Sequence, residues 1–265
     1  MNKKLIFLDL DGTLLDKEGK LSLFTIETIK SIAKRGHIFV IASGRPWRGI
    51  KGFYEKLELD TAVVGYNGAH IFHPLDKSFK EIRHTFPLES CKEIIRQIDF
   101  PVLNISFDDE HKFFLRKPDA LVLSYFPNSE DRMVDGNPLD NLTEDVYSLI
   151  FETEGEENDK KIKDLIEKYP PMKCRHWAWS KHSEAYYSFA DKGTAAEYVA
   201  SYYGISRKDV IAFGDSPNDY TMMKYAGEAY TAKLCDSKLL LESFPVLEKS
   251  NSEDAVAYKL LELFA

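Results

Sequence analysis

Two aspartates stand directly after a short apolar run near the start of the chain. The run Leu5–Leu8 leads to Asp9 and Asp11, which are followed by a Gly-Thr pair. Residues two apart in an extended segment point the same way, so these two carboxylates should lie side by side. Their mutual repulsion must be offset by a divalent cation, a lysine or a shared proton. Such a pair suits a nucleophile and an acid/base that work as neighbours.

Two structural explanations compete with this interpretation of the acidic turn. An EF-hand calcium loop needs glycine at its sixth position and glutamate at its twelfth. Counted from Asp9, the glycine comes fourth and Lys20 comes twelfth, so an EF-hand is excluded. The aspartates could instead only cap the helix that follows. This segment alone leaves that alternative open.

Ser43 and Arg45 follow a second apolar run, Ile38–Ala42, and precede Pro46. The Ser43 hydroxyl could donate a hydrogen bond to an oxyanion, or it could cap a helix that begins near Pro46. Arg45 could bind an anion, or it could be a solvated residue in the first helical turn. Both residues are therefore candidates for binding an anionic ligand.

A second acidic turn follows the run Val210–Phe213. It reads Gly-Asp215-Ser-Pro-Asn218-Asp219 and so offers carboxylate and amide oxygens, which suit a hard cation such as Mg²⁺. Ordinary helix capping by Asp215 is the alternative. Lys192 begins a predicted helix, where a cation is unfavourable against the helix dipole. This position indicates a compensating role for Lys192, with a plain surface lysine as the alternative.

Four apolar runs and the helices between them must position these residues. Each run is short, almost entirely apolar and rich in β-branched residues. Such runs are typical of strands that are covered on both faces of a parallel sheet. Helical periodicity fills the stretches between them, for example over residues 22–34. This alternation predicts an α/β fold with a doubly wound, mostly parallel, Rossmann-like sheet. Ligands of such sheets bind outside the carboxyl ends of the strands, where the polar segments lie.

The remaining run, Ala62–Tyr66, ends at Asn67-Gly68, which is a strong hairpin signal. We therefore predict a turn between two strands there, with Asn67 at the mouth of the site as a secondary interpretation. The stretch 83–187 has none of the strand-end signatures and mixes helices with strands of an antiparallel kind. It is predicted to be an inserted α/β domain, with 1–82 and 188–265 as the core. Within it, the acidic run Glu152–Asp159 is predicted to be a solvated loop.

The composition is that of an ordinary globular chain. The 265 residues are 44% hydrophobic and 29% charged, with a formal net charge of −8. No basic block stands out, which disfavours nucleic-acid binding, and no apolar run is long enough to span a membrane. The cysteines at positions 91, 174 and 235 are expected to be buried thiols in a reducing compartment. We expect a cytoplasmic protein, without nucleic-acid or membrane partners, that is a monomer or weak dimer.

Together, the polar segments resemble the signature of the haloacid dehalogenase superfamily of phosphohydrolases. Asp9-x-Asp11-Gly-Thr matches its first motif, Ser43 its second, Lys192 its third, and Gly-Asp215-x-x-Asn218-Asp219 its fourth. The segments 42–46, 67–69 and 192–194 are similar to the Cof-type branch, in which a large cap is inserted between the second and third motifs.

This resemblance implies a Mg²⁺-dependent phosphatase that hydrolyses small phosphorylated metabolites, such as sugar phosphates, through an aspartyl-phosphate. Asp9 would be the nucleophile and Asp11 the general acid/base. The substrate phosphate would be bound by Ser43, Gly44, Arg45, Lys192 and Asn218. Mg²⁺ would be bound by Asp9, Asp215 and the backbone carbonyl of Asp11, with Asp219 and Asn218 in support. The cap would set the substrate specificity.

Two other functions remain open at this point. A phosphotransferase or phosphomutase would use a similar core and cap, but it would need cap cations aimed at a second phosphate. Arg175 and Lys181, in a stretch that mixes cations with aromatic residues, could serve. A strand with one solvated face is the preferred explanation of that stretch. A non-catalytic sensor of phosphorylated ligands ranks last, because it need not retain both Asp9 and Asp11.

Overall fold

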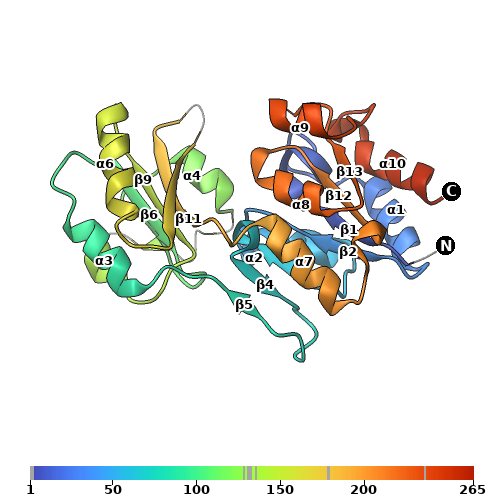
Figure 1. Cartoon of the computed structure of the whole chain (residues 1–265), viewed down its shortest axis with the longest axis horizontal. Coiled ribbons are helices and arrows are strands. Elements are labelled where there is room, and N and C mark those ends of the chain that lie inside the picture. The colour runs from blue at the N-terminus through green and yellow to red at the C-terminus, as the bar shows by residue number, and fades with distance from the viewer. Residues whose placement is uncertain (1–2, 128, 130–132, 135, 178–179, 236) are drawn as a thin grey trace. The chain divides into compact units, whose positions relative to one another are not determined.

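The computed structural model describes residues 3–127, 129, 133–134, 136–177, 180–235 and 237–265. These residues divide into two compact units (Figure 1). The core unit comprises Met1–Gly44, Ile50–Ile82 and Asp191–Ala265, and the inserted unit comprises Arg45–Gly49 and Arg83–Ala190. The inserted unit thus extends beyond the predicted 83–187 to Ala190, and it also includes the short segment around Arg48.

A parallel sheet of four strands lies at the centre of the core unit, in the order β13-β12-β1-β2. The strands are β1 (Leu5–Leu8), β2 (Ile38–Ile41), β12 (Val210–Gly214) and β13 (Glu228–Thr231). Leu8 pairs with Phe213 on one side and with Ile41 on the other, so the three strands end at one edge. Every residue of β1 and β2 is buried, as expected for strands covered on both faces. The predicted α/β fold class with a parallel core is confirmed.

Helices pack around this sheet. They are α1 (Leu23–Ala33), α2 (Trp47–Lys56), α7 (Lys192–Tyr202), α8 (Tyr220–Tyr225), α9 (Lys238–Ser243) and α10 (Ala255–Leu263). Buried residues of α7 and α8 share one hydrophobic cluster with Leu5 and Phe7 of β1. Helix α1 contacts β2 and α10. Ser22 caps α1, since its side chain accepts a 3.0 Å hydrogen bond from the Thr25 N–H.

A small sheet extends the core unit beyond β2, in the order β3-β4-β5. Its strands are β3 (Val63–Gly65), β4 (His70–Phe72) and β5 (Ile82–Arg83). A parallel bridge between Ala42 and Val64 joins it to the end of β2. Strands β3 and β4 are antiparallel and are connected by the turn Tyr66–Gly68, as the Asn-Gly signal predicts.

The inserted unit contains a mostly antiparallel sheet of six strands, in the order β10-β11-β9-β6-β7-β8. The strands are β6 (Asn104–Asp108), β7 (Phe113–Leu115), β8 (Met133–Val134), β9 (Ser148–Glu152), β10 (Met172–His176) and β11 (His182–Tyr187). The helices are α3 (Leu88–Arg96), α4 (Ala120–Tyr125), α5 (Pro138–Asn141) and α6 (Glu156–Ile166). Residues of α3 and α6, among them Ile94 and Leu165, pack with Ile105 and Phe151 of the sheet.

Two predictions for this unit need comment. The acidic run is not a loop throughout, because Glu156, Glu157 and Asp159 form the first turn of α6. Negative side chains are favourable there, since they face the positive end of the helix dipole. The sequence also predicts a strand over residues 172–178; the observed β10 ends at His176, and Ala178 lies outside the described residues. The three cysteines are buried thiols, as predicted.

The turn after β3 yields a test of how tightly the core is packed. Gly68 has φ +104°, and a Cβ atom placed on it would lie 2.3 Å from the carbonyl oxygen of Asp191. Gly68→Ala should therefore lower the stability of the core by more than the roughly 1–2 kcal/mol of a left-handed alanine, because the contact with backbone cannot relax cheaply. Urea unfolding followed by tryptophan fluorescence measures the loss.

Gly36→Ala provides the matched control. Gly36 has φ +92°, and nothing lies within 4 Å of a Cβ atom placed there. This variant should lose only the stability that a left-handed alanine costs, because its Cβ atom meets no neighbour. Equal losses in the two variants would mean that the contact between Gly68 and Asp191 contributes nothing.

Candidate active site

Asp9 is placed by the register of the central sheet. It follows β1, and its N–H donates a 3.2 Å hydrogen bond to the carbonyl of Phe213 in β12. Asp215 follows the end of β12 in turn. Because neighbouring parallel strands end at the same edge, the two acidic turns lie together, as the sequence predicts. Asp9 itself is 5% exposed.

Lys192 is fully buried and bridges two carboxylates. Its Nζ lies 2.6 Å from Oδ1 of Asp9 and 2.6 Å from Oδ1 of Asp219. The side chain is 0% exposed, so a surface lysine is excluded. A buried ammonium requires such partners because transfer out of water is otherwise very costly. The bridge therefore joins the segments after β1 and β12 to the first residue of α7.

Asp191 fixes the start of the helix that carries Lys192. Its side chain accepts a 2.8 Å hydrogen bond from the Thr194 N–H, and the Thr194 hydroxyl lies 3.2 Å from the Asp191 N. This reciprocal pair is a capping box, a role that sequence reasoning missed. The signal was present in the spacing of an acid and a hydroxyl three residues apart.

Asp219 organises the second acidic turn. Its Oδ2 accepts 3.0 Å hydrogen bonds from the N–H groups of Asp215 and Ser216, and its Oδ1 faces Lys192. Both carboxylate oxygens are thus engaged by the protein itself. The helix-capping alternative considered for Asp215 applies instead to Ser216, which forms a capping box with Asp219.

Asp215 points toward the first acidic turn. Its Oδ1 accepts a 3.0 Å hydrogen bond from the hydroxyl of Thr13, and its Oδ2 accepts one of 3.2 Å from Ser216. Burial, together with the charge of Asp219, raises the pKa of Asp215 to about 6. The contact of Thr13 with Asp215 was not predicted, since nothing in the sequence distinguishes it from an ordinary turn threonine.

The charges of this cluster are strongly coupled. Burial and the neighbouring Asp219 and Asp215 raise the pKa of Asp9 well above its ordinary value, although the Lys192 ammonium opposes them. Burial alone would lower the pKa of Lys192, but Asp219 and Asp9 outweigh it and hold that pKa above its ordinary value. The lysine stays charged, and the carboxylates remain in excess around it.

Three of the carboxylates could hold a cation. Asp9, Asp215 and Asp219 each offer an oxygen, and these oxygens all lie within 4.8 Å of one another. An all-oxygen donor set with excess negative charge fits a hard divalent ion. Asp11 lies two residues beyond Asp9 and is exposed at the same strand end.

The predicted anion-binding residues lie in different parts of the chain. Ser43 is 1% exposed, and its N–H donates to the Val64 carbonyl at 2.9 Å, which fixes it at the end of β2. The amide of Asn218 donates a 2.7 Å hydrogen bond to Oδ1 of Asn67. Arg45, in contrast, belongs to the segment grouped with the inserted unit, where its guanidinium donates to the Gly49 carbonyl at 3.4 Å.

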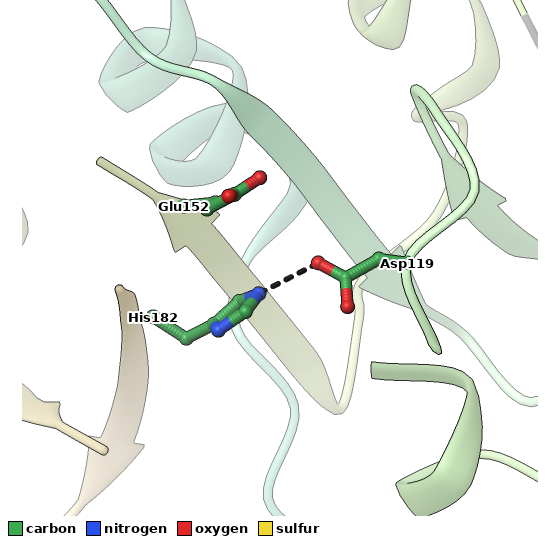
Figure 2. Close-up of side chains that lie close together, drawn as sticks. All are labelled: Asp119, Glu152 and His182. Carbon is green, nitrogen blue, oxygen red and sulfur yellow. Dashed lines mark hydrogen bonds and ion pairs between the residues drawn. The ribbon is translucent and has the colours of Figure 1, made fainter. Parts of the chain in front are cut away.

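A second cluster with metal-ligand chemistry lies within the inserted unit (Figure 2). The Nε2 atom of His182 lies 2.7 Å from Oδ2 of Asp119, with Glu152 beside them. Asp119 also caps α4 by accepting the Leu121 and Val122 N–H groups, and Glu152 lies 3.4 Å from the Lys117 ammonium. Each carboxylate thus has protein partners, and the cluster joins β9, β11 and α4 as a structural element.

The cations proposed for a second phosphate are also paired. Arg175 donates to Oε2 of Glu184 through Nη2 at 2.8 Å, and the Trp177 indole N–H donates to the same oxygen at 2.9 Å. Lys181 lies 3.0 Å from Glu154. These pairs favour a strand with a solvated face over a dedicated anion site in this stretch.

Sequence comparison identifies the family to which the chain belongs. The chain belongs to the haloacid dehalogenase-like hydrolase family, whose model matches residues 6–260. The resemblance seen in the motifs, including the Cof-type branch, is confirmed. The chain is thus an enzyme of the phosphatase class that this family contains.

Individual relatives support the assignment. The chain is 31% identical over 227 residues, 84% of each protein, to the 5-amino-6-(5-phospho-D-ribitylamino)uracil phosphatase YitU of Bacillus subtilis. It is also 28% identical over 291 residues to YwtE, a protein of the same organism that carries the same activity name. That alignment covers 99% of this chain and 98% of YwtE. A haloacid dehalogenase-like hydrolase from Bacteroides thetaiotaomicron has the same fold, with a TM-score of 0.81 and 23% identity. The alignment covers 99% of this chain and 100% of that structure.

Among the residues that the structure describes, no helix is both long and apolar enough to cross a lipid bilayer.

The buried bridge generates a prediction about stability and pH. Lys192→Met should lower the free energy of unfolding by about 3–5 kcal/mol near pH 7.5, because two buried carboxylates lose their shared cation. The loss should shrink near pH 5. Without the ammonium, the folded-state pKa of Asp9 rises further above its unfolded-state value, so protonation of Asp9 relieves the repulsion as the pH falls. Denaturant unfolding in chelator at both pH values measures the difference.

Lys181→Met is the control, since Lys181 and Glu154 form an exposed pair. It should change stability little at either pH, as exposed pairs contribute little. An equal loss at both pH values in Lys192→Met would indicate that the lysine acts through packing alone.

Proposed function

We propose that this phosphatase is Mg²⁺-dependent and hydrolyses phosphate monoesters of sugars or sugar alcohols through an aspartyl-phosphate on Asp9. The observation that carries the proposal is the buried Lys192, which bridges Asp9 and Asp219 beside Asp215. This arrangement holds a carboxylate in a fixed position at the edge of the sheet, surrounded by groups that can stabilise a phosphoryl group.

Asp9 has the properties that a nucleophile requires. Its Oδ1 is held by the Lys192 ammonium, so its direction is set by the protein. The carboxylate would attack the phosphorus atom, and the bond between phosphorus and the ester oxygen would break. Water would then attack the phosphorus of the aspartyl-phosphate, releasing inorganic phosphate and restoring Asp9. Covalent catalysis splits one difficult displacement into two easier steps.

The acidic cluster fits Mg²⁺. Asp9, Asp215 and the backbone carbonyl of Asp11 would hold the ion, whereas Asp219 is already engaged with Lys192 and with two backbone N–H groups and would support them. Burial and the charges of the neighbouring carboxylates raise the pKa values of Asp9 and Asp215, and a bound divalent ion would offset the repulsion among these carboxylates. When bound, Mg²⁺ supplies electrostatic stabilisation of the charge on the phosphoryl oxygens.

The remaining residues would bind the phosphate and move protons. Lys192, Ser43 and Asn218 would donate to the phosphoryl oxygens, with Gly44 and Arg45 as further predicted contacts. Asp11 would protonate the leaving alkoxide oxygen and later take a proton from the attacking water. Donors fixed in advance where negative charge develops usually give the largest share of catalysis.

The substrate class rests on the chemistry of the relatives' named substrate. That compound carries its phosphate on a ribityl chain, which is a sugar alcohol. We therefore propose an ester of a polyhydroxylated carbon chain, recognised by the inserted unit acting as a cap. A phosphomutase is the alternative, but Arg175 and Lys181 are paired with Glu184 and Glu154. A sensor without catalysis is disfavoured because Asp9, Lys192 and Asp215 form an intact cluster.

The direct test of the proposal measures phosphate release from a panel of sugar and sugar-alcohol phosphates, with Mg²⁺ and with chelator. Release should need Mg²⁺ but no bisphosphate activator, and Asp9→Asn should abolish it while the protein stays folded. In H₂¹⁸O, single-turnover reactions followed by peptide mass spectrometry should place ¹⁸O in phosphate and none in Asp9. This distribution follows if water attacks phosphorus in the intermediate.

Trapping of the intermediate distinguishes this mechanism from direct attack by water, which gives the same isotope distribution. Rapid acid quenching should recover ³²P on the peptide that contains Asp9, and hydroxylamine should release it. Substantial turnover by Asp9→Asn, or no trapped phosphopeptide at any time, would argue for direct hydrolysis.

The role of Asp11 generates a separate prediction. In Asp11→Asn, the first step should slow by about 10²–10⁴ for a sugar phosphate, because general acid catalysis of that order is lost. The same step should slow far less for p-nitrophenyl phosphate, whose leaving group needs no proton. Dephosphorylation of Asp9 should slow equally for both substrates, since the intermediate is the same. Stopped-flow measurements should therefore show a burst of nitrophenolate that appears or grows in the variant. An equal loss in the first step for both substrates would remove Asp11 from the role of general acid.

A further inference from the structure

We propose that Asn67 is a positioning residue for phosphate binding, acting through the amide of Asn218. This inference rests on the proposed function, since it concerns how Asn218 meets the phosphate. The hairpin signal explains why the chain turns at Asn67. It does not explain why an amide side chain stands there.

The backbone conformation alone would accept glycine. Asn67 has φ 57° and ψ 26°, and the preceding Tyr66 also has a positive φ of 46°. Asparagine is one of the few residues with a side chain that tolerates this left-handed region, but glycine adopts it at lower cost. A selection for the turn only would be satisfied by either residue.

The side chain of Asn67 is held between two other segments of the site. Its Oδ1 accepts a 2.7 Å hydrogen bond from Nδ2 of Asn218. A Cβ atom placed on Gly44 would lie 3.2 Å from the same oxygen, so the amide packs closely over the Gly44 backbone. The Asn67 N–H also donates to the Ser43 carbonyl at 3.0 Å. Asn67 thus joins the segments that follow β2, β3 and β12.

This contact fixes the direction of the Asn218 amide. A side-chain NH₂ group has two N–H bonds, and when Asn67 accepts one of them, the direction of the other is determined. The turn that contains Asn67 is also held by the next residue, Gly68, which packs against the carbonyl of Asp191. Asp191 directly precedes Lys192. Asn67 therefore holds a rigid acceptor for Asn218, and a rotating amide would lose this preorganisation.

Asn67→Gly separates the two roles of the residue, because it keeps the backbone conformation and removes the amide. With p-nitrophenyl phosphate as the probe, kcat/KM should fall about tenfold, the value of a typical hydrogen bond between neutral groups. The loss should fall mainly on KM, since the phosphate is held in both the ground and transition states. The melting temperature should change little. A turn-only role predicts unchanged kcat/KM.

Two controls make the assignment specific. Glu58 also has a positive φ, 53°, in the core unit, and its side chain pairs with Lys30. Glu58→Gly should leave kcat/KM unchanged. In a double-mutant cycle, Asn67→Gly should cost almost nothing further in an Asn218→Ala background, because both changes remove the same contact. Additive losses would show that Asn67 does not act through Asn218.

A readout without catalysis distinguishes failure of this inference from failure of the proposed function. In ¹⁵N-edited NMR spectra, the side-chain NH₂ signals of Asn218, identified by their loss in Asn218→Ala, should shift or broaden in Asn67→Gly. If these signals stay unchanged, or if they move while kcat/KM does not, the inference is overturned. A wild-type protein that releases no phosphate would overturn the proposed function instead, and the spectra would still decide whether Asn67 holds Asn218.

Discussion

The structure of the core unit depends on one buried ammonium. Lys192 is in contact with Asp9 and Asp219, so three segments that are far apart in the sequence must meet at a single point. A buried lysine without partners would strongly destabilise the fold, and the two carboxylates without the lysine would repel each other. The interaction therefore constrains the start of α7, the end of β1 and the turn after β12 at once. Removal of the lysine alone would leave two buried carboxylates without their shared cation, whereas a well-packed apolar trio could replace the whole group without loss of stability.

The parallel sheet meets this constraint through its register. Leu8 pairs with Phe213, and the Asp9 N–H continues the ladder to the Phe213 carbonyl. A slip of one residue would turn the side chain of Asp9 to the opposite face of the sheet and away from Lys192. The fully apolar sequence of β1 does not by itself exclude such a slip, since both of its faces are buried. The register is instead determined by the polar contacts at the strand ends, which form only when Asp9 faces Lys192.

The sequence predicts most of the core because its signals are local. Continuous apolar runs mark β1, β2 and β12 to within a residue, and Ser22 and Gly36 mark the ends of α1. The unfavourable dipole position of Lys192 indicated a special role, but its complete burial depends on tertiary packing that no local pattern contains. The acidic run that continues into α6 was wrongly predicted to be a solvated loop throughout. Its charge suggested exposure to solvent, but negative side chains also suit the first turn of a helix. The edge strand β13 was not predicted, because its four residues, Glu228–Thr231, include a charged one and lack the apolar continuity of the central strands.

The charge balance of the site links this architecture to the proposed chemistry. Asp9, Asp215, Asp219 and Lys192 together leave an excess of two negative charges when all are ionised, and burial together with the repulsion among the carboxylates raises the pKa values of Asp9 and Asp215. A divalent cation would balance this excess, and its charge would favour the ionised form of Asp9 that a nucleophile needs. A phosphate dianion would then approach a less negative site, with the lysine already in place. The same cluster is therefore the feature that would favour binding of the cation before binding of the phosphate.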